Sequence, residues 1–364
     1  MARQHRQPAT IARLRRQLLE WYARNRRDLP WRRNPDPYSI WVSEIMLQQT
    51  RVAVVVERYQ SFLARFPTLV SLASAPEQDV LALWSGLGYY RRARMLHKAA
   101  NFVVNQLDGK LPATSDALRM LPGIGAYTAA AISSIAHGEA IAVVDGNVER
   151  VLCRLEGWSA NGRDGALLKR KVEALAAQLL DPAHPGDFNQ ALMELGATVC
   201  VPRKPQCAAC PVIADCKTQG EHKTAARPRM QSREVAHALS LRTSPKPNQS
   251  HIEVLLEQRP ASLTVMPGLW QLPALKSAAV PQESLMMTVR HAIMQVNYYV
   301  RIRAVPEEGV KKLTVAGGER RWVPLTEAGE MALTGLARKV LARARLLARK
   351  PPVAIADERQ GNVL

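Results

Sequence analysis

The sequence predicts a multi-domain protein in which an all-α domain is followed by a smaller α+β domain, and two observations support this. Over residues 8–217, apolar side chains recur every three or four positions, which is the period of amphipathic helices. Over residues 234–345, apolar and polar side chains alternate, and prolines divide the chain into short segments typical of strands. A polar, basic linker is expected at 218–233 and a flexible tail at 346–364. With 364 residues, the chain is long enough for two cores.

The helical region opens with amphipathic patterns separated by turn signals. A first helix should bury Leu14, Leu18, Leu19 and Tyr22, and a later one should bury Val80, Leu83, Trp84 and Leu87. Turn-forming residues interrupt the helices at Asn34-Pro35-Asp36-Pro37, at Gly86-Leu87-Gly88 and from Pro182 to Gly186. The region therefore reads as a series of helices with tight connections.

Two carboxylates stand out because each lies in an apolar segment. Glu44 is the only charged residue from Trp41 to Thr50, and Asp145 closes the apolar run that starts at Val143. A carboxylate in apolar surroundings should have a raised pKa and could act as an acid near neutral pH. Taken singly, each is more often a capped or salt-bridged structural acid.

A short turn containing two glycines, Leu121-Pro122-Gly123-Ile124-Gly125, stands between predicted helices at 115–120 and 126–137. Ser115 is the expected N-cap of the first of these helices. The turn leaves backbone N–H groups uncovered at the start of the second helix, and such a terminus binds phosphate without reading base sequence. By itself the motif is a weak signal, since an ordinary helix–helix connection has the same composition.

Four of the five cysteines fall within 17 residues, with the spacing C-x6-C-x2-C-x5-C: Cys200, Cys207, Cys210 and Cys216. Four thiolates in short turns suit a [4Fe–4S] cluster or a tetrahedral zinc ion, and we favour the cluster. A pair of disulfides is the alternative. No apolar secretory segment follows Met1, so we expect a reducing, cytoplasmic compartment in which disulfides would not persist. Cys153 should be a buried structural thiol.

The charge balance indicates an anionic partner. The chain has 50 Lys and Arg against 31 Asp and Glu, a formal net charge of +19, and ten arginines lie in residues 1–33. A strong positive field attracts polyanions, most commonly nucleic acid, although a solubility role for the charge is the alternative. No apolar run approaches the ~18–20 residues of a membrane span, so no membrane partner is expected.

In the second domain, strand signals are clearest in two segments. Ile252, Val254 and Leu256 alternate with Glu253, Leu255 and Glu257, and residues 298–305 have similar strand character.

Taken together, these segments resemble the helix-hairpin-helix DNA glycosylases that carry an iron–sulfur cluster, and most closely the adenine DNA glycosylases of the MutY type. The similarity covers nearly 200 residues, from Leu29-Pro30-Trp31-Arg32 through Ser43 to Thr50, Gly86 to Tyr90, the hairpin, Asp145-Gly146-Asn147 and Phe188-Asn189-Gln190 to the four cysteines. The resemblance implies a helix-hairpin-helix core with a [4Fe–4S] loop, followed by a nudix-like domain.

Three features indicate the subfamily: the residue at position 127, the Ser-Glu-x-Met-Leu-Gln-Gln-Thr segment from Ser43 to Thr50, and the second domain, the last two being features of the adenine-specific type. The sister family, endonuclease III, carries a lysine two residues after the second hairpin glycine, and that amine forms a Schiff base with the sugar. Here the position is Tyr127, and a phenol cannot form an imine. The resemblance therefore implies a monofunctional adenine glycosylase that acts on duplex DNA with adenine opposite 8-oxoguanine or guanine.

The resemblance also assigns roles to single residues. Glu44 would protonate the departing adenine, Asp145 would stabilise the oxocarbenium-like sugar, and Tyr127 and Asn147 would orient this pair. The base must be flipped out of the duplex for this chemistry. The positions that would contact DNA are Arg32, Gln49, Tyr89, Leu121, Gly123, Gly125 and Gln190. For Gln49 and Tyr89, which would wedge into the vacated stack, ordinary helix-surface contacts are the alternative.

The second domain departs from the family pattern in its recognition loop. Met266 to Pro273 resembles the Gly-Leu-Trp segment of the nudix-like domain. A nudix hydrolase needs a helix rich in glutamates to hold Mg²⁺, but residues 276–289 contain a single glutamate, Glu283, so we expect no Mg²⁺-dependent hydrolysis. Ile293, Met294 and Gln295 stand where the family has Phe-Ser-His, and the serine of that loop contacts the oxidised guanine. Met for Ser removes a hydroxyl that donates and accepts.

Three rival functions were weighed. A bifunctional pyrimidine-lesion glycosylase conflicts with Tyr127, and a non-enzymatic iron–sulfur DNA-binding or redox-sensing protein has no use for an acid on an apolar helix. A nudix nucleotide hydrolase would need Mg²⁺-binding glutamates that this chain lacks. We further expect a monomer of bacterial type that associates with the nucleoid through DNA.

Overall fold

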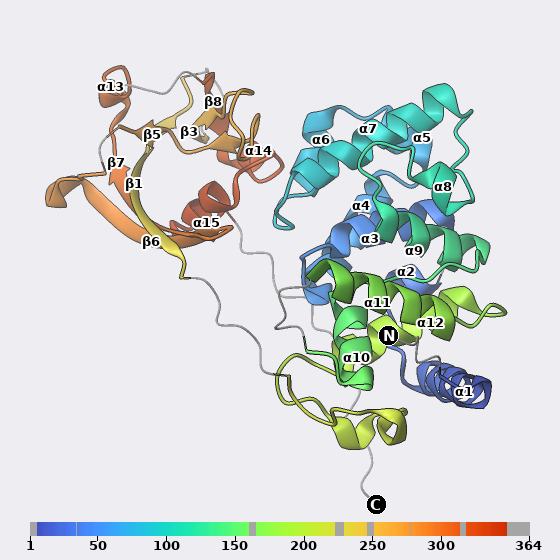
Figure 1. Ribbon diagram of the computed structural model, residues 1–364. Coiled ribbons are helices and arrows are strands. Elements are labelled where there is room, and N and C mark those ends of the chain that lie inside the picture. The colour runs from blue at the N-terminus through green and yellow to red at the C-terminus, as the bar shows by residue number, and fades with distance from the viewer. Residues whose placement is uncertain are drawn as a thin grey trace, which may run out of the picture. The chain divides into compact units, whose positions relative to one another are not determined.

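The computed structural model describes residues 6–33, 35–159, 165–222, 229–245, 251–276, 278–313 and 318–347 (Figure 1). The predicted tail, 346–364, lies outside the described residues from residue 348 onward. Residues 223–228 of the predicted linker also lie outside the described residues. The chain forms two compact units. Unit 1 comprises residues 1–49, 68–73 and 98–226, and unit 2 comprises residues 50–67, 74–97 and 227–364.

Unit 1 is helical throughout its described part. Its elements are α1 (Pro8–Asn25), α2 (Pro30–Arg33), α3 (Pro37–Leu47), α5 (Leu69–Ala73), α8 (Ser115–Leu118), α9 (Ala126–His137), α10 (Gly146–Glu156), α11 (Gly165–Leu179), α12 (Pro185–Thr198) and two 3₁₀ turns, η1 (Cys207–Ala209) and η2 (Ile213–Asp215). Helix α7 (Arg91–Gln106) begins in unit 2 and ends in unit 1. The all-α character predicted for this region is confirmed.

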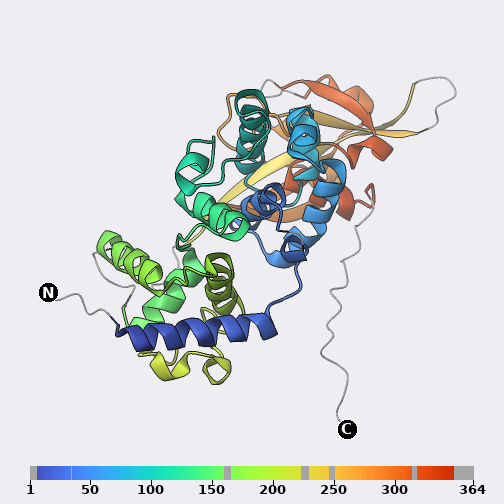
Figure 2. The same cartoon turned by 90° about the vertical axis from the view of Figure 1, so that its right-hand side faces the viewer.

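The main core of unit 1 is formed by α1, α10, α11 and α12. Leu14, Leu18 and Tyr22 of α1 are buried in it as predicted, because they lie on one stripe of the helix. Cys153 is buried in the same core, which confirms its structural reading. Figure 2 shows α1 running alongside the green helices α10 to α12, with the cysteine loop next to it.

Helix α3 is almost entirely buried, and its start is set by a single side chain. Asp36 is the N-cap, and its carboxylate accepts hydrogen bonds from the backbone N–H groups of Tyr38 and Ser39, while Pro37 occupies the first turn. Every residue from Tyr38 to Met46 is buried. Glu44 is therefore enclosed by apolar neighbours, as the sequence predicted.

The glycine-containing turn connects α8 to α9 as a helical hairpin. Helix α9 has the predicted bounds, and it ends where Gly138 takes the left-handed conformation with a φ of 69°. The predicted N-cap of α8 was wrong: Thr114, one residue before Ser115, caps the helix by accepting from the N–H of Ala117. Both residues carry a hydroxyl, so the sequence signal fits either position.

Unit 2 combines two helices with the second domain. It contains α4 (Val52–Arg65), α6 (Glu77–Leu83) and the start of α7. The hydroxyl of Tyr90 donates to the carbonyl of Leu333 at 3.1 Å, and the guanidinium of Arg94 donates to the carbonyl of Pro267 at 2.7 Å. Arg338 donates to the hydroxyl of Ser85 at 2.9 Å. These buried or half-buried bonds join residues 85–94 to loops and helix α15 (Gly335–Arg343) of the second domain.

The second domain is α+β, as predicted, and contains two sheets. Its strands are β1 (Gln231–Leu239), β2 (Leu241–Thr243), β3 (Ile252–Gln258), β4 (Trp270–Gln271), β5 (Ala274–Leu275), β6 (Leu285–Ile293), β7 (Val296–Ala304) and β8 (Arg320–Pro324). The helical pieces are η3 (Gln282–Ser284), α13 (Glu307–Val310), α14 (Leu325–Ala328) and α15 (Gly335–Arg343). One sheet has the order β5-β1-β7-β6, and in the other β3 pairs with β2, β4 and β8.

The first sheet is mixed. Strand β1 runs parallel to β7, with Gln231 opposite Val296 and Leu239 opposite Ala304. Strands β6 and β7 form an antiparallel hairpin in which Ile293 faces Val296, so Met294 and Gln295 alone make the turn. Figure 1 shows this hairpin and β1 as one strongly curved layer.

The predicted alternation in β3 was wrong in one respect, since both sides of the strand are buried from Glu253 to Glu257. The strand is paired along both edges, with β8 on one side and β2 and β4 on the other, and Val254 and Leu256 pack into the domain core. Its glutamates are tolerated there because arginines pair with them: Arg242 lies 2.7 Å from Glu253 and Arg320 lies 3.5 Å from Glu257. Among the described helices, none combines the length and apolar character needed to span a bilayer.

Candidate active site and cysteine cluster

Glu44 is the best candidate for an acid in unit 1. Its side chain is 6% exposed on α3. Burial raises its pKa to about 7, an effect opposed by a hydrogen bond from Tyr127 and reinforced by the negative charge of Asp145. A carboxyl group with a pKa near neutrality carries its proton at a pH where an ordinary glutamate does not.

Tyr127 comes from the first turn of α9 and faces Glu44. Its hydroxyl donates to Oε2 of Glu44 at 2.8 Å and lies 3.6 Å from the sulfur of Met193. Burial, followed by the negative charge of Glu44, raises the pKa of Tyr127 well above its ordinary value. The phenol therefore stays neutral and remains a hydrogen-bond donor.

Asp145 and Asn147 form the second half of the candidate site. Asp145 is the N-cap of α10, and its Oδ1 accepts from the backbone N–H groups of Asn147 and Val148 at 2.9 and 2.7 Å. The amide of Asn147 donates to Oδ2 of Asp145 at 2.9 Å. Three donors thus fix the orientation of the carboxylate.

Helix α12 packs against the segment that carries Asp145 and Asn147 and holds it in place. The side chain of Asn189, 1% exposed, accepts from the N–H of Val143 and donates to the carbonyl of Ile141, which fixes the segment that leads into Asp145. At Gly196, a Cβ atom would lie 2.7 Å from the Cβ of Asn147. Only glycine allows α12 to approach α10 this closely. Asn189 was noticed in the sequence only as part of a motif, and Gly196 was missed.

Arg150 connects Asn147, which holds Asp145, to the start of the cysteine loop. Arg150 donates to Oδ1 of Asn147 at 2.9 Å, to the carbonyl of Gly196 at 2.6 Å and to the carbonyl of Cys200 at 2.8 Å. The sequence analysis missed Arg150, although Asn147, Arg150 and Arg154 are spaced at i, i+3 and i+7 on one face of α10.

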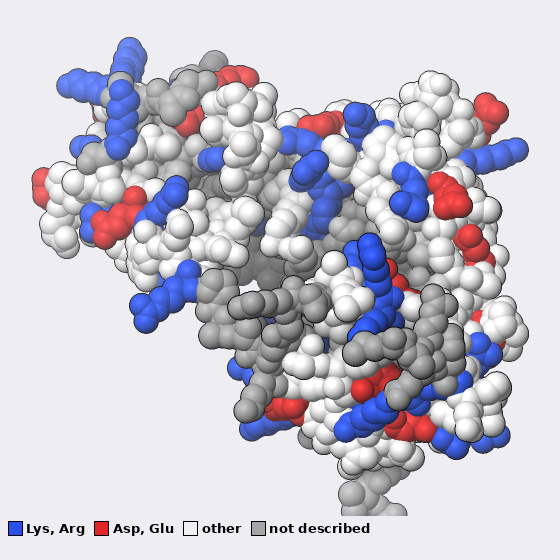
Figure 3. Space-filling model, viewed as in Figure 1, with Lys and Arg blue, Asp and Glu red and all other residues white. Residues whose placement is uncertain are grey.

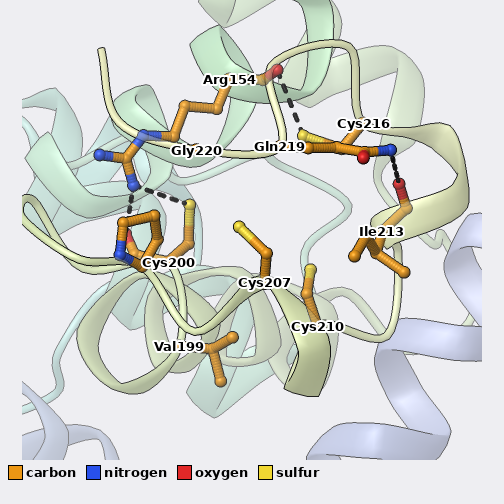
Figure 4. A pocket seen from close by; sticks show the side chains of 10 residues that line it. Arg154, Val199, Cys200, Cys207, Cys210, Ile213, Cys216, Gln219 and Gly220 are labelled. Atoms are coloured by element: carbon orange, nitrogen blue, oxygen red, sulfur yellow. Dashed lines mark hydrogen bonds between the residues drawn. The ribbon is translucent and has the colours of Figure 1, made fainter. Parts of the chain in front are cut away.

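The four predicted cysteine ligands do converge. Cys200, Cys207, Cys210 and Cys216 all line one pocket, and Figure 4 shows their sulfur atoms around the same interior space. The structure shows them as free cysteines, without disulfides. The buried Arg154 encloses the pocket by donating to the carbonyls of Cys200, Val201 and Pro202 and to the sulfur of Cys200 at 3.4 Å.

These residues fit a metal cluster. The guanidinium of Arg154 donates to the sulfur of Cys200 at 3.4 Å, and cysteines bind metals as thiolates. Burial, followed by weaker effects of the neighbouring thiols, raises the pKa of Cys210 to about 11, so its binding to a metal would release a proton. Among the described residues, no three His, Cys, Asp or Glu side chains are placed to hold one metal ion.

Arg32 lies in a buried ion-pair network. Glu194 on α12 accepts from the guanidiniums of Arg27 at 2.7 Å and Arg32 at 2.9 Å, and also from the backbone N–H of Arg27 at 3.1 Å. Burial alone would raise the pKa of Glu194, but the hydrogen bonds from the two arginines outweigh it and lower the pKa to about 2. Arg32 thus has partners inside the protein, and its predicted contact with DNA stays a prediction.

Gln190 and Arg32 also line a second cavity, of about 290 Å³, together with Trp31, Asp187 and residues at the end of α9. The cavity opens between α2, α9 and the start of α12, all within unit 1. Glu44 and Tyr127 are not among the residues that line it. Gln190 thus lies at this cavity, and its predicted contact with DNA also stays a prediction.

The hairpin has the geometry expected of a phosphate-binding turn. Leu121 is 2% exposed and anchors the turn in the core. Gly123 has a φ of 77°, which favours glycine, and both Gly123 and Gly125 are exposed. No side chain caps the start of α9, and a Cβ at Gly125 would meet nothing within 4 Å. The first N–H groups of α9 are therefore open to an anion.

Two residues predicted to contact DNA, Gln49 and Tyr89, share a left-handed backbone conformation with Met294 of the recognition loop and with five other non-glycine residues among those described. Gln49, Tyr89 and Met294 have φ values of 54°, 46° and 53°. Each of these side chains is exposed, Tyr89 to 48% and Met294 to 73%. Left-handed backbone at a non-glycine residue costs about 1–3 kcal/mol and is concentrated at functional sites. On the face that Figure 3 shows, Lys and Arg side chains are spread over both parts of the molecule.

Comparison with known proteins agrees with this arrangement. Residues 42–180 match the family model described as HhH-GPD superfamily base excision DNA repair protein. The chain is 47% identical over 246 residues to the adenine DNA glycosylase of Homo sapiens, covering 65% of this chain and 43% of the relative. It is 40% identical over 324 residues to that of Arabidopsis thaliana, covering 78% of this chain and 50% of the relative. The chain thus spans about half the length of these curated relatives.

Among solved structures, a thermostable thymine-DNA glycosylase matches with a TM-score of 0.52 at 29% identity, covering 58% of this chain and 97% of that one. A non-covalent endonuclease III–DNA complex matches at a TM-score of 0.50 and 21% identity, covering 59% of this chain and 97% of that one, which supports the helical fold. Residues 42–180 are thus similar in sequence to the helix-hairpin-helix base excision repair proteins, and the helical region shares their fold. Within that class, the chain is similar in sequence to adenine DNA glycosylases.

Proposed function

We propose that this protein is a monofunctional DNA glycosylase that removes adenine paired with 8-oxoguanine or guanine in duplex DNA and leaves an abasic site. The observation that carries the proposal is the buried Glu44, whose pKa is raised to about 7 and whose carboxyl group accepts a hydrogen bond from Tyr127. Its relatives named adenine DNA glycosylase support the choice of base.

The proposed mechanism begins with proton transfer. Adenine leaves readily only when a ring nitrogen is protonated, and the buried Glu44, with a pKa of about 7, carries a proton in a large fraction of molecules at neutral pH. As the glycosidic bond breaks, the sugar gains positive charge, and the carboxylate of Asp145 stabilises it. The hydrogen bonds from Asn147 and Val148 fix the orientation of the Asp145 carboxylate. Water then attacks the sugar.

The absence of an amine at position 127 supports the monofunctional assignment. Tyr127 occupies the start of α9, directly beside Glu44, and its raised pKa keeps it protonated. A neutral phenol neither forms an imine with the sugar nor promotes strand cleavage by elimination. The DNA strand would therefore stay intact after base removal.

Binding of the duplex would use the hairpin for phosphate and the left-handed residues Gln49 and Tyr89 as wedges. The open N–H groups at Gly125 and Ala126 suit a phosphate, which positions the duplex without reading sequence. A wedge in the vacated stack lowers the cost of flipping the adenine. The protein is proposed to act as a monomer on chromosomal DNA in the cytoplasm.

The four cysteines are the proposed ligands of a [4Fe–4S] cluster, which would supply structural cross-linking of the loop. Purified protein should be brown, and Cys207→Ser should lose the colour and much of the folded yield. Metal analysis after anaerobic handling distinguishes the alternatives. A colourless protein with one zinc per chain would overturn the cluster assignment.

The test of the activity is a set of duplexes with adenine opposite 8-oxoguanine, guanine or thymine. Adenine release is expected for the first two, and strand breaks are expected only after alkaline treatment. Glu44→Gln serves as the inactive control. Strand cleavage without alkali would favour the bifunctional sister family, and release of adenine opposite thymine at the same rate would remove the mispair specificity.

A further inference from the structure

The two residues proposed as wedges, Gln49 and Tyr89, lie in segments with an unfavourable backbone conformation. Gln49 follows α3 with a φ of 54°, and Tyr89 precedes α7 with a φ of 46°. In the turn before Tyr89, Gly86 and Gly88 also have positive φ values, of 99° and 71°. Such a backbone persists only where the surrounding contacts hold it. The groups that hold these two segments therefore determine where the wedges lie.

The guanidinium of Arg92, in the first turn of α7, contacts both segments. Its Nη2 atom donates to Oγ1 of Thr50, the residue that follows Gln49, at 3.1 Å. The same atom donates to the carbonyl oxygens of Leu87 and Gly88, at 3.2 and 3.3 Å. The hydroxyl of Thr50 in turn donates to the carbonyl of Leu87 at 3.3 Å. Hydrogen bonds thus join the residue after one wedge to the turn that leads into the other, all within unit 2.

Arg92 also contacts the ring of Tyr89 directly. Its guanidinium carbon lies 5.5 Å from the centre of that ring and 5.6 Å from the centre of the Trp84 ring. A cation within about 6 Å of an aromatic ring is attracted to its face. Trp84 is fully buried, and its indole N–H donates to the carbonyl of Gly88 at 3.1 Å. Arg92 therefore connects the exposed ring of Tyr89 to a ring that is fixed in the core.

We propose that Arg92 is a positioning residue that holds Gln49 and Tyr89 in place as a pair, and thereby sets how readily the adenine leaves the base stack. The proposal rests on the proposed function in that it takes these two residues as the wedges. Burial lowers the pKa of Arg92 to about 10, so the guanidinium keeps its charge at neutral pH. A planar guanidinium can bond several acceptors in fixed directions and stack on aromatic rings at the same time.

Binding of a DNA phosphate is the other role that a cation at this position could have. The two roles differ in what a lysine can replace. The ammonium of Arg92→Lys supplies the same charge to a phosphate, but it is a point charge without the planar fork that joins Thr50 to the turn. A phosphate contact also contributes about 0.9 to the slope of log K against log salt. Positioning predicts that Arg92→Lys fails to replace arginine and that Arg92→Gln leaves this slope unchanged.

Fluorescence of 2-aminopurine at the adenine position measures base flipping separately from excision, because stacking quenches this base. The duplex carries it opposite guanine, and each variant is made together with Glu44→Gln so that the base stays attached. At saturating protein, Arg92→Gln and Arg92→Lys should lower the flipping equilibrium about tenfold or more, the loss expected for a hydrogen bond to a charged group. Thr50→Val removes one acceptor and should give a smaller loss, which adds little to that of Arg92→Gln.

Excision by the same variants with Glu44 intact provides the second measurement. Single-turnover rates for Arg92→Lys should fall by a similar factor, while the midpoint of the pH profile stays at about 7, because Glu44 is unchanged. The matched control is Arg94→Gln. Arg94 lies two residues further along α7 and donates to Glu77 and to the carbonyl of Pro267, away from both wedge segments. This control should flip and excise like the parent, and thermal melting verifies that each variant is folded.

The proposal is overturned if Arg92→Lys keeps the fluorescence rise of the parent, or if Arg94→Gln lowers it as much as Arg92→Gln does. If the Arg92 variants do not fold, Thr50→Val decides the question, and an unchanged fluorescence rise in that variant overturns the proposal. A parent that flips the base but releases no adenine would reject the proposed function and leave the positioning role standing. A parent that shows no fluorescence rise would overturn both.

Discussion

The hydroxyl of Tyr127 donates a hydrogen bond of 2.8 Å to the carboxyl group of Glu44, and the two residues come from helices α9 and α3. Burial of Glu44 raises its pKa to about 7, while the hydrogen bond from Tyr127 opposes the rise. The pKa of Glu44 is therefore set by two effects of opposite sign, burial and the hydrogen bond from Tyr127. Near neutral pH, comparable amounts of Glu44 are protonated and ionised, which is the condition a general acid requires.

Glu44→Gln should abolish adenine excision and leave DNA binding in place. The amide has nearly the shape of the carboxyl group but carries no acidic proton, and general acid catalysis contributes about 10²–10⁴-fold or more. Single-turnover excision and equilibrium binding to the same mispaired duplex check the two halves of this prediction. Near-normal excision by the variant would remove Glu44 from the mechanism.

The same substitution should stabilise the protein at alkaline pH. The pKa of Glu44 is raised from 4.5 to about 7 in the folded state, so its favourable contribution is complete below pH 4.5 and is lost as pH rises to about 7. The shift corresponds to about 3 kcal/mol at 1.36 kcal/mol per pH unit. Urea unfolding at pH 8 should show Glu44→Gln to be more stable than wild type, with the difference shrinking toward pH 5.

Tyr127→Phe should move the alkaline limit of activity to higher pH. Excision requires protonated Glu44, so the rate should fall as pH rises through about 7. Removing the phenol hydroxyl removes the interaction that lowers this pKa, and a hydrogen bond worth about 1 kcal/mol corresponds to roughly 0.7 pH unit. Single-turnover rates between pH 5.5 and 9 measure the shift. A profile that moves to lower pH, or does not move, would contradict the role of this hydrogen bond.

Glu194→Ala should destabilise the protein by about 3–5 kcal/mol at pH 7, because it leaves two arginines without their buried partner. The pKa of Glu194 is lowered to about 2, so its contribution is present above pH 4.5 and lost as pH falls toward 2. The difference in free energy of unfolding between Glu194→Ala and wild type should thus become smaller at acidic pH. Glu20→Gln, which breaks only exposed ion pairs of α1, is the control and should change stability by less than about 1 kcal/mol.

Tyr127→Lys supplies the amine that the proposed mechanism lacks. We expect the variant to form a covalent complex that borohydride traps and to cut some DNA without alkali, because an amine beside the reacting sugar forms a Schiff base. Wild type should trap little. Efficient trapping by the wild type would mean that another amine attacks the sugar.

The sequence predicted those features that depend on neighbouring residues. Glu44 was expected to be buried because the residues around it are apolar, and α9 was expected at 126–137 because a glycine turn precedes it and Gly138 follows it. Thr114 was not identified as the cap of α8, because the adjacent Ser115 carries the same functional group.

Contacts between distant segments could not be predicted in this way. Glu194 pairs with Arg27 across 167 residues, and Arg150 reaches Cys200 across 50 residues. No local pattern in the sequence specifies such partners, since a charged residue on a helix usually faces solvent. The burial of both faces of β3 was missed for the same reason: Arg242 and Arg320, which pair with its glutamates, come from other strands.

The last prediction concerns the β6–β7 turn. Met294, 73% exposed with a φ of 53°, and Gln295 form its two-residue tip, where the family has a serine and a histidine. A missing hydrogen bond to the opposite base costs roughly 1–3 kcal/mol of discrimination. Wild type should thus remove adenine opposite both 8-oxoguanine and guanine with a narrow preference, and Met294→Ser with Gln295→His should widen it. The rate of the chemical step should stay the same, since Glu44 and Asp145 are untouched.

Relative excision rates on the two duplexes at limiting enzyme measure this preference. Asn297 is a poor candidate for an alternative reader of the base, because its side chain is buried and accepts from Arg290 at 3.3 Å. Gln295 is exposed at the tip, so its amide is the group that could replace the missing serine. If wild type discriminates strongly and Gln295→Ala erases the preference, then the loop reads the lesion through Gln295, and the expectation of relaxed specificity is wrong.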